Sequence, residues 1–268
     1  MNLLNIGIIV QVRFDSSRFP GKAAATLWRQ ESTISFLLKR LSRLNQQPNQ
    51  TLVVATADTV DCDYFEKLCQ EIDIIIFRGN KENVFSRFLD CASKFSFDVI
   101  VRITGDCVLH CPQLVQSFID TWCSVNQFSR EDFILTNKYP FSFCDGFDVE
   151  VFSMELMRKN FNAIFDSSHF QEHVTTFFYE NPGIKKINIL NQKPLHFPTV
   201  RLVLDYPEDL KALKEIVICY VKSFPKNSPL EKMTYTEIAS LDLFQNWSEN
   251  PNLAPNFAYL EQNSTLFL

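Results

Sequence analysis

Apolar runs that suit buried strands alternate with stretches of helical periodicity through the first half of this chain. The predicted strands cover residues 4–12, 51–56, 73–77 and 98–103. The predicted helices cover residues 33–44, 61–72, 82–95 and 112–125. In these helices the apolar residues recur at a spacing that places them on one face. The alternation predicts βαβ units with right-handed crossovers, and therefore an α/β fold with a mostly parallel sheet.

The regular alternation weakens after a short predicted strand at residues 133–136. Beyond it we predict strands at 147–152 and 184–190, and helices at 154–165 and 170–180. The segment VRLVLD, residues 200–205, is predicted to be a strand, and Pro207 follows it at the start of a predicted helix. Residues 138–198 are therefore predicted to form a lobe inserted before the last strand of the sheet, within a single domain that spans residues 1–268.

The composition is that of an ordinary globular protein, with 46% hydrophobic and 21% charged residues. The formal net charge is −5, so broad attraction to nucleic acid or to an anionic membrane is not expected. There is no apolar run of roughly 20 residues and no N-terminal signal peptide, so we expect a cytoplasmic protein. Its eight cysteines are then expected to be free thiols. Cys107, His110 and Cys111 lack a second pair of zinc ligands, so we expect no zinc site there.

The loop Gln11–Lys22, QVRFDSSRFPGK, directly follows the first predicted strand. Its Arg13, Arg18 and Lys22 outnumber Asp15, so the loop is cationic within an acidic chain. Backbone N–H groups, hydroxyls and cationic side chains can bind a polyphosphate, and ligands bind at the carboxyl ends of strands in open α/β sheets. On composition alone, a solvated basic loop explains these residues equally well.

Two aspartates also follow or end predicted strands. Asp106 follows the strand at 98–103, and Asp205 ends the strand at 200–205. Two carboxylates that face a cationic loop can hold Mg²⁺ against phosphate oxygens. The alternative is that these residues form turns or cap helices, as aspartate often does. For Asp209, in the first turn of the next helix, we favour the cap.

Five segments in this order and spacing resemble the cytidylyltransferase family of the spore-coat polysaccharide biosynthesis type: QVRFDSSRFPGK, RITGDC, GFDVEVF, QEHVT and RLVLDYPEDL. That family is related to the acylneuraminate and 3-deoxy-manno-octulosonate cytidylyltransferases. The resemblance runs from about Ile6 to Asp209, and ENPNLAPNFAYLEQN near the C-terminus resembles the family's C-terminal helical segment. Five ordered motifs are a more specific signal than a single glycine-rich loop.

The resemblance implies a three-layer sandwich with a mostly parallel, Rossmann-like sheet of the nucleotide-diphospho-sugar transferase type. It implies an acceptor-binding and dimerisation lobe at about 138–198, a C-terminal helical segment at about 207–262, and a homodimer. The implied reaction transfers CMP from CTP to an acidic sugar or related acceptor in surface polysaccharide biosynthesis, with Mg²⁺ as cofactor and with release of pyrophosphate. The implied partners are CTP and a small-molecule acceptor, with no nucleic acid and no membrane.

The resemblance also assigns roles to the residues that match its motifs. Nucleotide contacts are assigned to Arg13, Ser16, Arg18, Lys22, Arg78, Gly79 and Arg87. Asp106 and Asp205 match the metal ligands, and they form the implied catalytic set together with Arg18 and Lys22. Acceptor contacts are assigned to Asp148, Glu150, Glu172 and His173. His173 can be either a base or a buried histidine that is hydrogen-bonded within its helix.

The chain departs from the family pattern at several positions. Asp15 stands where the family has glycine, and its carboxylate would repel phosphates unless it turns outward, pairs with an arginine or joins the metal ligands. Asn83 and Ser86 stand where acidic residues are common, Val108 where proline is usual, and Tyr206 where threonine is usual. Two alternatives therefore stay open. One is a different nucleotide or acceptor, such as a polyol phosphate or a phosphonate, and the other is a catalytically inactive nucleotide-binding paralogue.

Overall fold

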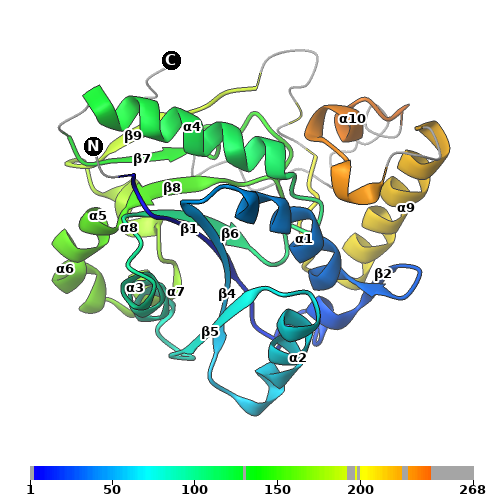
Figure 1. Ribbon diagram of the computed structural model, residues 1–268, viewed down its shortest axis with the longest axis horizontal. Coiled ribbons are helices and arrows are strands. Elements are labelled where there is room, and N and C mark those ends of the chain that lie inside the picture. The colour runs from blue at the N-terminus through cyan, green and yellow to red at the C-terminus, as the bar shows by residue number, and fades with distance from the viewer. Residues whose placement is uncertain (1–2, 129–130, 192–196, 198–199, 225–228, 243–268) are drawn as a thin grey trace.

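A seven-stranded sheet forms the centre of the computed structural model, which describes residues 3–128, 131–191, 197, 200–224 and 229–242 (Figure 1). The strand order is β5-β4-β1-β6-β8-β7-β9. The strands are β1 (Ile6–Gln11), β4 (Gln50–Ala57), β5 (Ile75–Gly79), β6 (Val99–Thr104), β7 (Phe133–Thr136), β8 (Glu150–Ser153) and β9 (Lys185–Asn188). Only β8 in this sheet runs against its neighbours, so the predicted mostly parallel sheet is confirmed.

Helices cover both faces of the sheet, because its central strands are apolar on both sides. One face carries α1 (Thr33–Leu41), α2 (Asp63–Glu71) and α4 (Pro112–Phe128). The other carries α3 (Val84–Lys94), α5 (Met154–Lys159), α6 (Phe161–Phe165) and α8 (Thr176–Glu180). Within β1, Ile8 packs toward the first group and Ile9 toward the second. The predicted three-layer α/β architecture is thus confirmed.

Several predicted elements are shorter or divided in the structure. The helix predicted at 154–165 is two helices, α5 and α6. The helix predicted at 170–180 is α7 (Ser168–Glu172) and α8, with residues 173–175 between them. A small antiparallel pair, β2 (Thr26–Trp28) and β3 (Glu31–Ser32), was not predicted. Two 3-10 turns also lie near predicted helices, Ser42–Gln46 after α1 and Val60–Cys62 before α2.

The prediction that residues 200–205 form a strand of the sheet is wrong. The only β-type contact of this segment in the described residues is an isolated bridge between Arg201 and Asp145. The segment's apolar side chains pack instead against α9 (Pro207–Ser223) and α10 (Tyr235–Ala239), in a cluster separate from the sheet core. Alternating apolar residues can therefore reflect packing of an extended segment without a hydrogen-bonded ladder.

Part of the range 138–198 belongs to the sheet itself, because β8 and β9 are two of its strands. The role of this range in acceptor binding and subunit pairing stays a prediction. Of the predicted C-terminal segment, the structure describes α9, the 3-10 turn Leu230–Lys232 and α10, and residues 243–262 lie outside the described residues. None of the helices in the described part of the chain is long and apolar enough to cross a bilayer.

Candidate active site

The carboxyl ends of β1 and β6 bring the basic loop and Asp106 next to each other. Gln11 pairs with Thr104 at the end of the ladder, and the N–H of Gly105 donates to the carbonyl of Gln11 at 2.8 Å. A Cβ atom at Gly105 would lie 3.0 Å from the Cβ of Val12, so glycine allows this close approach. Because the strands are parallel neighbours, the chains leaving them start side by side.

Lys22 joins the two aspartates that the sequence placed at strand ends. Its Nζ atom donates to Asp106 Oδ2 at 2.9 Å, to Asp205 Oδ1 at 3.1 Å and to the Leu204 carbonyl at 2.7 Å. The Leu204 N–H in turn donates to the Asp106 carbonyl at 3.0 Å. The two carboxylates, far apart in the sequence, therefore converge on one ammonium group.

Asp205 is held by two arginines as well. Arg18 contacts Asp205 Oδ1 at 2.7 Å, and Arg201 contacts Asp205 Oδ2 at 2.6 Å and Asp209 Oδ1 at 2.8 Å. Asp209 Oδ2 accepts hydrogen bonds from the N–H groups of Asp205 and Tyr206 at the start of α9, which confirms its predicted capping role. The Arg18 guanidinium lies 5.2 Å from the centre of the Tyr206 ring, a cation–π contact.

A cavity of about 240 Å³ opens beside this cluster. The predicted site residues that line it are Arg13, Ser16, Arg18, Lys22, Arg87, Asp106, Glu172, His173 and Asp205. The structure thus gathers most of the predicted nucleotide set, both predicted metal ligands and two predicted acceptor residues around one space. Its walls carry more cationic than anionic side chains, which suits a polyanionic ligand.

Arg87 is an unusual member of this wall because it is almost fully buried, with 1% exposure. Its Nη1 atom donates to the carbonyl of Asn80 at 2.7 Å, and its Nε atom has no hydrogen-bond partner in the described residues. Burial lowers the pKa of Arg87 to about 10, with no carboxylate among the groups that oppose the shift. A buried guanidinium without a carboxylate partner is costly unless an anion approaches it.

Three of the predicted residues do not line this cavity. Arg78 contacts the carboxylates of Asp58, Asp63 and Glu66 at 3.1, 2.6 and 2.8 Å. Gly79 follows it at the end of β5. Asp148 pairs with Lys138 at 3.1 Å. Their assigned contacts with nucleotide or acceptor stay predictions.

Glu150 is buried, with 1% exposure, and also lies outside the cavity lining. It accepts a hydrogen bond from Arg102 and one of 2.7 Å from the hydroxyl of Tyr179. Burial alone would raise the pKa of Glu150, but Arg102 and Lys138 outweigh it and lower that pKa to about 2. Arg102 lines the cavity and donates to Gln11 Oε1 at 3.2 Å. Glu150 therefore does not face the cavity itself, but it binds Arg102, which does.

His173 is exposed, and it follows the last residue of α7. The alternative that it is a buried histidine within a helix is therefore wrong. Asp15 is exposed too, does not line the cavity, and forms no ion pair with any residue that the structure describes. Of the three orientations considered for Asp15, the structure shows the outward one.

Sequence reasoning missed Arg102 and Arg201, although both stand inside motifs that were recognised. Arg102 lies in RITGDC and Arg201 begins RLVLDYPEDL. In each motif the arginine lies within five positions of the aspartate that was predicted to bind metal. A cation so close in sequence to a candidate metal ligand is itself a signal, because it can orient that ligand.

The acidic residues fit a divalent cation that is shared with phosphate. No group of three or more acidic, histidine or cysteine side chains in the described residues is arranged to hold a metal by itself. Mg²⁺ commonly takes one or two carboxylates together with substrate phosphates, which is the donor set that Asp106 and Asp205 offer. Burial alone would raise the pKa of Asp106, but Lys22 outweighs it and lowers that pKa, so the carboxylate is ionised.

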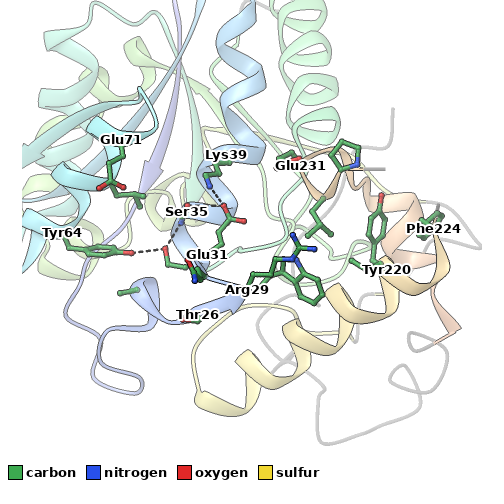
Figure 2. Close-up of a pocket in the computed structure, with 18 residues that line it drawn as sticks. Thr26, Arg29, Glu31, Ser35, Lys39, Tyr64, Glu71, Tyr220, Phe224 and Glu231 are labelled. Atoms are coloured by element: carbon green, nitrogen blue, oxygen red, sulfur yellow. Dashed lines mark hydrogen bonds and ion pairs between the residues drawn. The ribbon is translucent and has the colours of Figure 1, made fainter. Parts of the chain in front are cut away.

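A larger cavity, of about 1010 Å³, lies elsewhere, between the β2–β3 pair and parts of α1, α2 and α9 (Figure 2). Polar groups on its wall are paired with one another: Lys39 contacts Glu31 at 2.6 Å, and the Tyr64 hydroxyl donates to Ser32 at 3.0 Å. Neither Lys22 nor the two aspartates it joins line this cavity. The smaller cavity is therefore the better candidate for chemistry, in spite of its size.

Comparison with known proteins gives a family match over most of the chain. A family model described as cytidylyltransferase matches residues 7–242. The spore coat polysaccharide biosynthesis protein SpsF of Bacillus subtilis is 29% identical over 216 residues, which is 79% of this chain and 86% of that protein.

Solved structures agree with the fold. A cytidylyltransferase from Leptospira borgpetersenii superposes with a TM-score of 0.76 and 26% identity, covering 95% of this chain and 98% of that one. A CMP:2-keto-3-deoxy-manno-octonic acid synthetase complexed with CTP superposes with a TM-score of 0.54 and 12% identity, covering 80% and 98%. At 12% identity, the second comparison supports the fold alone.

Proposed function

Because this chain belongs to the cytidylyltransferase family, we propose that it transfers CMP from CTP to an acidic sugar or related acceptor, releasing pyrophosphate, in surface polysaccharide biosynthesis. The observation that carries the proposal is the cluster of Lys22, Asp106 and Asp205 at a cavity lined by further arginines. Such a cluster combines charge neutralisation for phosphates with carboxylates for a divalent cation.

The cationic residues of the cavity wall are proposed to bind the triphosphate. Arg13, Arg18, Lys22 and Arg87 line the cavity and would bind the triphosphate, with Ser16 as a hydroxyl donor. Attack of the acceptor oxygen on the α-phosphorus breaks the bond to the β-phosphate oxygen, and negative charge builds on the leaving pyrophosphate. Cations positioned around the leaving group before the chemical step stabilise that charge. The protein needs no covalent intermediate for this step.

Magnesium is the cofactor that we propose. Asp106 and Asp205 would hold it, and when bound it would offset charge on the phosphate oxygens. Arg201 contacts the oxygen of Asp205 that Lys22 and Arg18 do not. Arg201 therefore fixes the carboxylate's orientation, and leaves Oδ1 turned toward Lys22.

Glu172, His173 and Arg102 line the same cavity, and we assign the acceptor to their side of it. Arg102 is the cation of this group and suits an acidic acceptor. Glu150 would contribute by holding Arg102.

We further propose a cytoplasmic homodimer. All eight cysteines are free, as expected in a reducing compartment. Phe165, in the range assigned to subunit pairing, is 45% exposed.

Pyrophosphate release with each of the four nucleoside triphosphates, over a panel of acidic sugars and sugar phosphates, tests the proposal. We expect release with CTP and an acidic acceptor, and none with Asp106→Asn under the same conditions. Preference for another triphosphate, or for a polyol phosphate or phosphonate, would favour the first alternative. Silence of the purified protein across the whole panel would favour an inactive paralogue.

A further inference from the structure

The hydrogen bonds of Lys22 leave it no donor for a phosphate. An ammonium group has three protons, and Lys22 Nζ has three acceptors at 2.7 to 3.1 Å: Leu204 O, Asp106 Oδ2 and Asp205 Oδ1. Its side chain is only 14% exposed. To contact a nucleotide, this ammonium must give up at least one of these bonds.

The same ammonium lies where a cation shared by the two carboxylates would lie. It contacts one oxygen of Asp106 and one of Asp205. A divalent cation bound to those oxygens would be about 2.1 Å from each. Lys22 and a metal that contact the same oxygens disfavour each other, because two positive charges would then lie close together.

From these two facts we infer that Lys22 is a competitor of the metal, a stand-in cation that keeps the two carboxylates paired until phosphate groups draw it away. The inference rests on the proposed function, and it assigns an order to binding at that site. Metal alone must displace the ammonium from its hydrogen bonds to the two carboxylates. A nucleotide offers that ammonium new acceptors and frees the carboxylates, so nucleotide and metal each favour binding of the other.

Arg18 and Arg201 behave differently when Lys22 leaves the carboxylates. Arg18 shares Asp205 Oδ1 with Lys22, and its side chain is 52% exposed, so it can move together with Lys22. Arg201 contacts Oδ2 and is fixed by Asp209, so it stays in place when the other two leave. The carboxylate of Asp205 then keeps its orientation while its partner changes.

The test measures binding of Mn²⁺ alone to the full chain, by electron paramagnetic resonance titration. Lys22→Met removes the competing ammonium at similar side-chain length. We expect it to bind Mn²⁺ about tenfold more tightly than the wild type. Arg13→Met is the matched control, because Arg13 lines the same cavity but is in none of the ion pairs of Asp106 and Asp205 in the described residues. We expect it to change Mn²⁺ affinity by less than about threefold, since only a screened, longer-range charge is lost. Equal gains in the two variants, or no gain in Lys22→Met, would overturn the inference.

A second measurement needs no variant, in case Lys22→Met does not fold. With lysine side chains labelled by ¹⁵N, the bonded ammonium of Lys22 should give a slowly exchanging signal in the wild type. Inorganic pyrophosphate without metal should shift that signal, and a signal unchanged at saturating pyrophosphate would contradict the exchange. If the wild type turns over CTP but the binding measurements show no competition between Lys22 and Mn²⁺, only this inference is overturned. Lack of turnover, by contrast, would overturn the proposed function.

Discussion

Asp15 and Arg18 lie in one loop after β1, yet their surroundings differ. Arg18 lines the cavity and contacts Asp205, whereas Asp15 is exposed and outside the lining. The loop's sequence showed that both charges were present, but not which of them faces the ligand. That depends on the path of an irregular segment, which residue type and spacing do not determine.

The orientation of Asp15 predicts that Asp15→Gly leaves turnover with CTP within about tenfold of wild type, a difference of no more than ~1.4 kcal/mol in activation free energy. Arg18→Ala is the comparison, and we expect a larger loss because it removes a cation from the cavity wall. Steady-state pyrophosphate release measures both. A silent wild type beside an active Asp15→Gly would instead identify the natural chain as an inactive paralogue.

At the scale of elements, the segment between β6 and α4 illustrates what sequence could and could not predict. For lack of a second ligand pair we expected no zinc site at its Cys107, His110 and Cys111, and their structural role was not foreseen. The His110 Nε2–H donates to the carbonyl of Asp148 at 3.1 Å, and the ring lies 5.9 Å from that of Phe147. Such long-range contacts depend on the tertiary fold.

Burial lowers the pKa of His110 to about 4, so its protonation opposes folding. The unfolded chain binds this proton with a pKa of about 6.5, and the folded chain does not bind it until the pH falls near 4. Stability is therefore lost as the pH falls from about 6.5 toward 4. Between pH 7.5 and pH 5 this group should cost about 2 kcal/mol in the free energy of unfolding.

Urea unfolding of wild type and His110→Gln at these two pH values measures the effect. The variant should lose about 2 kcal/mol less than the wild type over that interval, whatever its stability at pH 7.5. Parallel losses in the two proteins would show that His110 does not titrate on unfolding.

The helix and strand predictions succeeded where an element buries a regular face, as β1, β4 and α3 do. They failed where a segment is buried by side-chain packing but is not hydrogen-bonded into the sheet. Leu202 and Leu204 are buried as strand residues would be, but they lie against α9 and α10. The reversed direction of β8 was also beyond the sequence, because apolar alternation does not depend on strand direction.

At the scale of the whole molecule, Arg40 connects parts of the chain that lie far apart in the sequence. It is fully buried, with 0% exposure, and extends from α1. Its guanidinium donates to the carbonyls of Leu109 and His110, and to those of Leu230 and Met233 in the C-terminal part. One cation therefore ties the first helix, the segment after Asp106 and the final described helices together.

We expect Arg40→Met to lower the free energy of unfolding by about 3 kcal/mol or more, because buried carbonyls lose their donors. Lys39→Met is the control. Lys39 precedes it in α1, is 45% exposed and pairs with Glu31, so its loss should cost less than about 1 kcal/mol. Chemical denaturation of both variants checks the difference. Similar small losses would mean that water or neighbouring groups satisfy these carbonyls.

The hydrogen bond from the Leu204 N–H to the Asp106 carbonyl has a consequence for the chain as it is synthesised. Lys22 and Asp106 leave the ribosome long before Asp205, so the nascent protein carries only part of the cluster proposed as its active site. The loop after β1 and the end of β6 can meet early, but Lys22 lacks two of its three acceptors until residues 204 and 205 emerge. The cluster therefore becomes complete late in translation, with the segment that joins the sheet to α9.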